Sequence, residues 1–339
     1  MLLSLLAIAA GLVILIYSAD VFIDGAVALA TKYHMPKMLI GALIIGVGTS
    51  APELVVSALS AIAGSPGLAL GNAYGSNIVN IMLVLGITAL IAPIIIQKQV
   101  LKTDFVWLIS STVISVILLM DGHIDRLDGA ILIAVLAANI IVQILYAKRH
   151  AKAASESAIL ASDEHAYELE LDAQELPDST QVSTAKSLFK LIAGLIVLVL
   201  SSRLIVWGAV ELAKLWGLSD LIIGLTIVAV GTSLPELVSS IIAARRGEYE
   251  LALGNVLGSN LFNTTGVVGL AALIAPMTVN PEVLSRDTVV MCIITLVLFV
   301  MCAFALRKDG QIGRISGAFL LLCFVAYSGW LAVSALGLA

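Results

Sequence analysis

The chain is organised as a series of long apolar runs, each about as long as a helix that crosses a bilayer. A spanning helix takes about 20 mostly apolar residues, and only 12% of this chain is charged, against roughly 25% in a soluble domain. Ten such runs lie near residues 2–31, 37–63, 68–91, 103–120, 125–147, 187–214, 219–244, 249–276, 286–305 and 312–333. We therefore expect an all-α membrane protein of ten transmembrane helices with the lipid bilayer as a partner. The net charge of −5 gives no basic excess for nucleic acid.

The chain also contains an internal duplication. Residues 41–94 align without a gap on residues 224–277, at an offset of 183, with 29 identities in 54 positions. Five spans separate equivalent positions, and because five is odd, the second copy must enter the membrane from the opposite side. The pattern predicts two inverted-topology five-helix repeats: residues 1–147 and 187–339, joined by a linker over 148–186.

The basic residues predict the orientation of these spans, because cytoplasmic loops retain Lys and Arg. With both termini outside, fourteen of the 18 basic residues fall on the cytoplasmic side and three on the outer side. We expect a multi-pass protein of the inner (plasma) membrane, with the linker in the cytoplasm.

The linker is the most polar part of the chain, with eight acidic and four basic residues. Such a composition is typical of a solvated, partly disordered tether. A calcium-sensing loop is the alternative, but from Asp163 onward the sequence lacks the alternating Asp/Asn ligands and central Gly of an EF-hand.

Two carboxylates interrupt otherwise apolar spans. Glu53 and Glu236 each end the sequence Gly-Thr-Ser-x-Pro-Glu, and an ionisable residue at membrane depth marks an ion or substrate path by default. Pro52 and Pro235 cannot donate the helical hydrogen bond, so each frees a carbonyl one turn earlier. Carbonyl and hydroxyl oxygens are therefore expected beside each carboxylate.

The next span of each repeat adds a hydroxyl and an amide on one helix face. Ser76 and Asn80 are four residues apart, as are Ser259 and Asn263. Any one such residue is better explained by hydrogen bonding between helices, but the doubled set around two glutamates favours a cation site. Ca²⁺ takes six to eight oxygens, and this set is sufficient. No nucleophile–base pair accompanies it, so we do not expect an enzyme.

The doubled Gly-Thr-Ser-x-Pro-Glu and Gly-Ser-Asn-x-x-Asn pattern resembles the alpha repeats of the calcium/cation antiporter superfamily, most closely the prokaryotic sodium/calcium exchangers. The resemblance covers nearly the whole chain. It implies the sodium/calcium exchanger fold, in which ten helices alternate access to a midplane site that takes up Ca²⁺ or Na⁺. It also implies that spans 2–31 and 187–214 form a long tilted pair that slides against the other eight.

By this resemblance, the site consists of carboxylates, hydroxyls, amides and two backbone carbonyls. The implied ion-binding residues are Glu53, Glu236, Asn80, Asn263, Thr49, Ser50, Thr232, Ser233, Ser76 and Ser259, with the carbonyls of Gly46 and Ala229. The transported ions are Ca²⁺ and Na⁺, and no cofactor is expected.

The chain departs from the family pattern at Asn263, where many sodium/calcium exchangers carry Asp. The site then has a formal charge of −2, which one Ca²⁺ or two monovalent ions balance. Protons also compete for a buried pair of like charges. The function that we expect is export of Ca²⁺ in exchange for Na⁺, with a H⁺-coupled antiporter and a cation channel as the alternatives.

One further pair of charges lies on the two sliding spans. Asp20 and Arg203 are equivalent positions of the two repeats, and they form either a salt bridge or separate contacts with water at helix ends.

Overall fold

The computed structural model describes residues 1–339 except His34, Ser65, 166–182, 216–228, Asn280, Glu282, Asp309 and 336–339. The expectation of an all-helical membrane protein is confirmed. Within the described ranges, eight helices are long and apolar enough to cross a membrane, and a ninth span is a bent pair of helices. The predicted seventh span, 219–244, lies partly outside the described residues.

The first half of the chain contains the following elements, in which η marks a π-helical segment. They are α1 (Leu2–Lys32), α2 (Lys37–Ile40), η1 (Gly41–Gly46), α3 (Val47–Thr49), α4 (Ala51–Ile62), α5 (Pro66–Val79), η2 (Asn80–Val84), α6 (Leu85–Ile91), β1 (Ile94–Ile95), α7 (Lys98–Lys102), α8 (Asp104–Leu119), β2 (His123–Ile124) and α9 (Arg126–His165).

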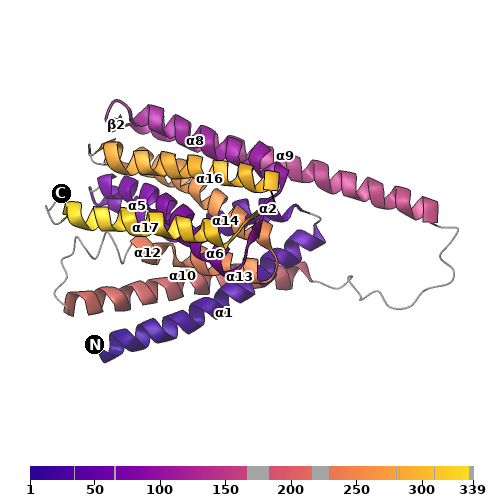
Figure 1. Ribbon diagram of the computed structural model, residues 1–339, viewed down its shortest axis with the longest axis horizontal. Coiled ribbons are helices and arrows are strands. Elements are labelled where there is room, and N and C mark those ends of the chain that lie inside the picture. Colours follow the sequence, from indigo (N-terminus) through magenta and orange to yellow (C-terminus); the bar gives the residue numbers. More distant parts are fainter. Residues whose placement is uncertain are drawn as a thin grey trace.

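The second half repeats much of this order. Its elements are α10 (Thr184–Leu215), α12 (Ala229–Thr232), α13 (Leu234–Arg245), α14 (Tyr249–Phe262), η4 (Asn263–Val267), α15 (Val268–Ile274), β3 (Met277–Thr278), η5 (Val283–Asp287), α16 (Thr288–Lys308), β4 (Gln311–Ile312) and α17 (Arg314–Ala335). The start of α1 and the end of α17 lie at the same end of the bundle (Figure 1).

Helices α1 and α10 run side by side along one edge of the bundle (Figure 1). Glycines allow their backbones to touch: a Cβ on Gly25 would lie 2.6 Å from the Leu191 nitrogen, and one on Gly194 would lie 2.8 Å from the Phe22 nitrogen. Small residues at such a crossing permit close packing in lipid.

The proposed Asp20–Arg203 salt bridge is wrong, because Asp20 pairs with Arg246, which follows α13. Arg246 also pairs with Asp24 of α1, and Lys190 of α10 donates to the same carboxylate at 3.1 Å. The repeat alignment failed here because it matched equivalent positions of the two halves, whereas this cluster joins α1 to a loop.

Each glutamate-bearing span is broken just before its glutamate. Ser50 leaves the helical conformation at φ −82°, ψ 8°, and Ser233 does so at φ −88°, ψ 7°. The chain turns by 43° between Lys37–Thr49 and Ala51–Ile62. A proline occupies the first turn of α4 and of α13, where its missing N–H costs no helical bond. The carbonyls one turn earlier are not left free as expected, because that of Gly48 accepts a backbone N–H and that of Gly231 accepts the Ser202 hydroxyl at 2.8 Å.

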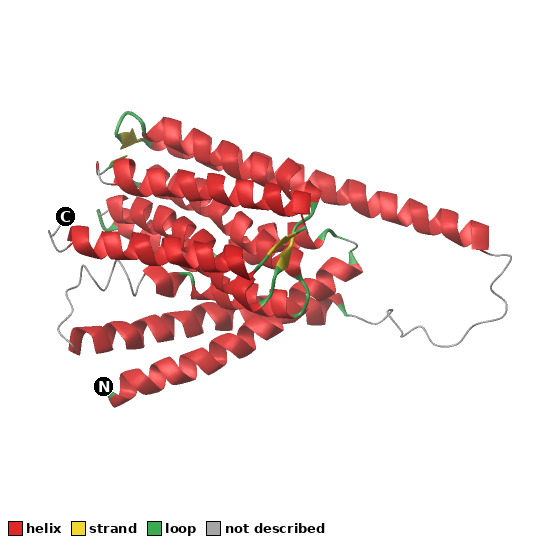
Figure 2. Ribbon diagram, viewed as in Figure 1, coloured by secondary structure: helices red, strands yellow, loops and turns green. Residues whose placement is uncertain are grey.

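The two strand pairs join the halves of the chain. β1 pairs antiparallel with β4, with Ile94 opposite Ile312, and β2 pairs with β3, with His123 opposite Thr278. The pairs lie at opposite ends of the bundle (Figure 2). Helix packing also crosses between halves, since α6 packs on α17 and α15 packs on α9.

The spans that carry the Ser/Asn motif form the centre of the molecule. In an 18-residue apolar window of Leu68–Ile91 and of Tyr249–Ile274, 72% and 78% of the residues are buried, against 11–39% in the corresponding windows of the other six unbroken spans. Their polar side chains therefore face protein rather than lipid, as irregular or polar groups at membrane depth require.

Helix α9 continues past the predicted end of its span at residue 147 and reaches His165, well beyond the bundle (Figure 1). The expected linker boundary at residue 148 therefore falls within a helix, and residues 148–165 are helical rather than a flexible tether. Residues 166–182, with most of the alternative calcium-sensing loop, lie outside the described part. At its other end the predicted linker is too long, because α10 begins at Thr184 rather than at residue 187.

Candidate cation site

Both glutamates are completely buried at the start of a helix. Glu53 lies in the first turn of α4 and Glu236 in the first turn of α13, and each has 0% of its surface exposed. A helix N-terminus favours negative charge through its unpaired N–H groups. The break before each helix thus places a carboxylate at the end that stabilises it.

Hydroxyls from neighbouring elements contact these carboxylates. The Ser50 hydroxyl donates to Glu236 Oε1 at 2.9 Å, so the first half of the chain supplies a hydrogen-bond donor to the glutamate of the second half. The Ser76 hydroxyl of α5 donates to Glu53 Oε1 at 3.4 Å. One oxygen of each carboxylate is therefore engaged by a neutral donor.

The broken span of the first half is hydrogen-bonded to α14. The Thr49 hydroxyl lies 3.0 Å from Asn255 Oδ1, and the Ser259 hydroxyl donates to the Gly46 carbonyl at 3.0 Å. A Cβ on Gly258 would lie 2.2 Å from the Ala42 carbonyl oxygen, so η1 and α14 touch through backbone atoms. This contact brings the oxygens of Thr49 and Gly46 toward those of the second Ser/Asn motif.

Two asparagines that the sequence motifs did not assign to the site hold the glutamates in place. Asn72 donates through Nδ2 to the Glu53 carbonyl at 3.2 Å, and Asn255 donates to the Glu236 carbonyl at 3.1 Å. Each amide also donates to a serine hydroxyl one turn further along the glutamate helix. The signal in the sequence was the Gly-Asn pair that precedes each Ser/Asn motif at the same offset of 183.

Several buried polar atoms of this region have no hydrogen-bond partner within the described part of the chain. They are Glu53 Oε2, Glu236 Oε2, both terminal atoms of the Asn80 and Asn263 amides, and Ser233 Oγ. A buried polar group without a partner is costly, and two of these atoms belong to carboxylates. A cation bound by these oxygens would remove the cost.

The charge of the region also calls for a cation. Among the described residues, neither Glu53 nor Glu236 forms an ion pair with Lys or Arg. Two ionised carboxylates are balanced by one divalent or two monovalent ions. Carboxylate, amide and hydroxyl oxygens are the ligands that hard cations such as Ca²⁺ prefer.

The remaining expected site residues lie at the ends or starts of short helical segments. Asn80 and Asn263 are fully buried and begin the π-helical segments η2 and η4, and such segments often occur at functional sites. Thr232 is buried at the end of α12, and Ala229 is the first residue of that helix. The Asn80 and Asn263 amides do not hydrogen-bond to each other, so their convergence on one ion stays a prediction.

A protein-family model and several known proteins match most of the chain. The family described as "Sodium/calcium exchanger protein" matches residues 3–145 and 186–333. The chain is 40% identical over 327 residues to the putative antiporter CaxA of Alkalimonas amylolytica, covering 96% of this chain and 98% of that protein. It is 30% identical over 337 residues to the sodium/calcium exchanger MaX1 of Methanosarcina acetivorans, covering 94% and 95%.

A solved structure of the sodium-calcium exchanger NCX_Mj, soaked with 100 mM Na⁺ and 10 mM Sr²⁺, superposes with a TM-score of 0.78 at 30% identity. The match covers 96% of this chain and 97% of that one. The inner membrane protein YrbG of Escherichia coli is 33% identical over 333 residues, covering 98% and 97%.

Proposed function

Because the chain belongs to the sodium/calcium exchanger protein family, a family of membrane antiporters rather than enzymes, we propose that it exports Ca²⁺ in exchange for Na⁺. The observation that carries this proposal is the set of unpartnered buried oxygens around Glu53 and Glu236. Both ions would compete for this one site, and an ion would have to be bound before the protein changes the side to which the site opens.

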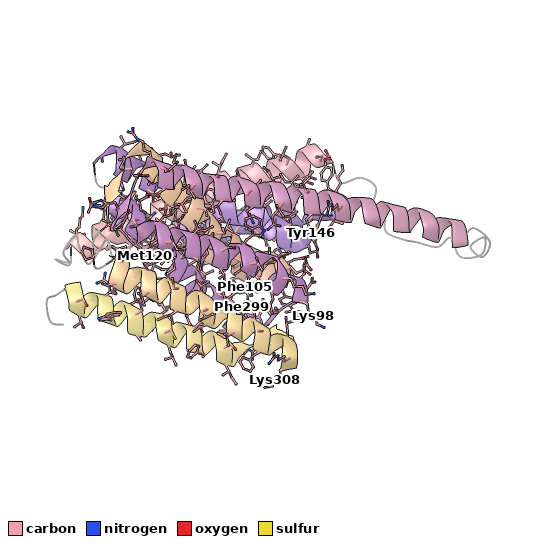
Figure 3. The ribbon with its side chains drawn as sticks, turned by 90° about the horizontal axis from the view of Figure 1, so that it is seen from above. Lys98, Phe105, Met120, Tyr146, Phe299 and Lys308 are labelled. Atoms are coloured by element: carbon pink, nitrogen blue, oxygen red, sulfur yellow. The ribbon has the colours of Figure 1, made fainter. Side chains whose placement is uncertain are left out.

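The membrane arrangement that we propose has ten spans in two inverted repeats, with the ion site near the midplane. The paired hydrogen bonds of Asn72 and Asn255, at positions 183 apart, support the two-fold relation. The span 219–244, seventh in order, would complete the ten together with the nine found among the described residues. Lys98 and Lys308 lie toward one end of the bundle and Met120 toward the other (Figure 3), which supports a cytoplasmic face at the lysine end, with both termini outside and the linker inside.

Alternating access would involve two parts of this architecture, the broken span 37–62 and the α1–α10 pair. The break at Ser50 allows the segment 37–49 to move relative to α4, and its contact with α14 at Gly258 would close the cytoplasmic side of the site. The α1–α10 pair would slide along the bundle, while the Arg246 ion pairs with Asp20 and Asp24 hold one position of α1. In this scheme, the state described here is closed toward the cytoplasm.

Coupling to H⁺ is the second candidate, and Asn263 favours it. With a neutral amide at this position, the formal charge of the two carboxylates is −2, and one Ca²⁺ or two protons neutralise them equally well. Proton coupling would need only that each glutamate releases its proton when Ca²⁺ arrives.

The test is Ca²⁺ uptake by purified protein in proteoliposomes. An imposed Na⁺ gradient should drive uptake, and a pH gradient of equal size should not. Glu53→Gln and Glu236→Gln should each abolish uptake, because the amide removes a charge that a dehydrated cation needs. Ca²⁺ flux that persists without any counter-ion gradient, or that survives both substitutions, would refute exchange at this site.

A further inference from the structure

A third buried carboxylate lies outside the site described above. Asp104 begins α8 and is only 8% exposed. Its oxygens accept hydrogen bonds from the Thr103 hydroxyl at 3.1 Å and from Gln143 Nε2 of α9 at 3.4 Å. Both donors are neutral, and among the described residues no Lys or Arg forms an ion pair with this carboxylate.

The duplication supplies an internal comparison. The offset of 183 carries Asp104 onto Asp287 and Thr103 onto Arg286. In the second half, Arg286 donates to Asp287 at 2.8 Å and 3.2 Å, so that carboxylate has its counter-charge beside it. In the first half, a threonine stands where the arginine would be.

The last helix of each half also differs near the aspartate. Tyr327 of α17 donates to Asp287 at 2.8 Å. At the offset of 188 that carries Arg126 onto Arg314 and Gly129 onto Gly317, the equivalent of Tyr327 in α9 is Asn139. Asn139 is 2% exposed, and its Nδ2 has no partner in the described part of the chain. The second half therefore has an Arg–Asp–Tyr cluster with a counter-charge, and the first half has Thr103, Gln143 and Asp104 without one, beside an Asn139 Nδ2 that has no partner among the described residues.

A small cavity occupies this position in the first half. Its volume is about 20 Å³, and its polar lining residues are Asp104, Asn139 and Gln143. Asn139 and Gln143 are four residues apart and share one face of α9. The other lining residues are apolar or glycine, among them Ala42 of η1 and Gly258 of α14. A single water needs about 10–15 Å³ measured in this way, so the cavity has room for one small occupant.

Helix α8 is held firmly at this place. Phe105, the residue after Asp104, packs edge-to-face on Phe299 of α16, with ring centroids 5.5 Å apart (Figure 3). The residue next to Asp104 is therefore anchored in the core, and the Asp104 side chain itself is buried.

We propose that Asp104, Asn139 and Gln143 bind one dehydrated monovalent cation, Na⁺ in particular, at a site separate from the glutamate pair. The cation takes the place of the positive charge that Arg286 supplies in the other half. One carboxylate and one monovalent ion form a neutral pair, whereas Ca²⁺ would keep an excess charge and needs six to eight oxygens. Each amide can present its oxygen instead of its nitrogen to the cavity by a half-turn of its terminal group.

The experiment measures equilibrium binding of radioactive Na⁺ to purified full-length protein. The background is the Glu53→Gln/Glu236→Gln double variant, so the result does not depend on the proposed transport activity. In this background, the protein should still bind about one Na⁺ per chain. Adding Asp104→Asn should remove this binding, and an excess of Ca²⁺ should compete for it poorly.

Two further variants keep the test decisive. Thr103→Arg builds the arrangement of the second half into the first, so it should abolish Na⁺ binding while leaving the thermal unfolding temperature unchanged or raised. If Asp104→Asn fails to fold, Thr103→Arg still tests the proposal. Asp287→Asn is the matched control and should leave Na⁺ binding intact.

Three outcomes would overturn the proposal. The first is the absence of Na⁺ binding in the double glutamine background, as expected if the cavity holds only water. The second is Na⁺ binding that survives Asp104→Asn, and the third is Na⁺ binding that survives Thr103→Arg. None of them would bear on whether Glu53 and Glu236 transport Ca²⁺.

Discussion

Replacing Gly258 with alanine should loosen the contact that we assign to cytoplasmic closure. The added Cβ would lie 2.2 Å from the Ala42 carbonyl oxygen and 2.5 Å from the Ala42 Cα. Both neighbours are backbone atoms, so η1 must move away from α14 by about 1 Å to restore ordinary contact. Overpacking of this kind costs about 1–3 kcal/mol, which corresponds to a shift of about 5–150-fold in the equilibrium between packed and separated states.

Hydrogen–deuterium exchange of the purified protein measures this shift directly. Amides of residues 41–46 should exchange about 5–150-fold faster in Gly258→Ala, because their protection depends on packing against α14. Gly254→Ala should act in the same direction but less strongly, since its Cβ would lie 2.6 Å from the Met38 carbonyl oxygen. Amides of α16 should be unaffected in both variants.

Gly329→Ala in α17 is the matched control, because no described atom lies within 4 Å of the added carbon. Its exchange pattern should equal that of the unmodified protein. If Gly258→Ala also left residues 41–46 as protected as before, η1 would not rely on this backbone contact, and its assignment as the closing element would fail.

Three other variants test separate parts of the structure. Asn255→Ala removes the hydrogen bonds that Asn255 donates to the Glu236 carbonyl and to the Ser240 hydroxyl, so thermal unfolding should show a loss of about 1–3 kcal/mol and Ca²⁺ binding should weaken. Unchanged Ca²⁺ affinity would contradict the positioning role. Arg246→Ala breaks ion pairs that are partly exposed, so the loss of stability should stay below about 1 kcal/mol, and a larger loss would show that the cluster is more than a surface contact. Asn263→Asp changes the formal charge of the site from −2 to −3. The rate of Ca²⁺ exchange should then depend differently on membrane voltage, since moving one charge through 100 mV is worth about 2.3 kcal/mol. Currents identical to those of the unmodified protein would place Asn263 outside the ion site.

The features that sequence reasoning predicted well are those that hydropathy and motif repetition encode directly. Apolar length reveals a spanning helix, and Glu53 and Glu236 stand out because a carboxylate within an apolar run is costly unless it serves an ion or substrate path. The extent of α9 was missed because residues 148–165 are polar, and hydropathy ends the span where the apolar residues end. Their Ala, Lys and Glu content nevertheless favours a helix.

Other features were missed because they depend on partners far away in the chain. The two-residue strands carry no local signal, since Ile94 becomes a strand residue only by pairing with Ile312. Asp20 was matched to Arg203 by the repeat, but its actual partner is Arg246. The contrast between Asp104 and Asp287 likewise needed the structure, because only there do Arg286 and Tyr327 converge on one carboxylate.

The exchange of contacts between the two halves has a consequence for how the protein is made. During synthesis, the first five helices leave the ribosome well before β4 and α17 exist, yet β1 and α6 complete their packing only against those last elements. The nascent half must therefore wait in the bilayer with an unpaired strand edge at each end and its central glutamate unsupported by the second half. Shortening the chain by its final helix should thus send the whole protein, rather than only its C-terminal half, to membrane quality control.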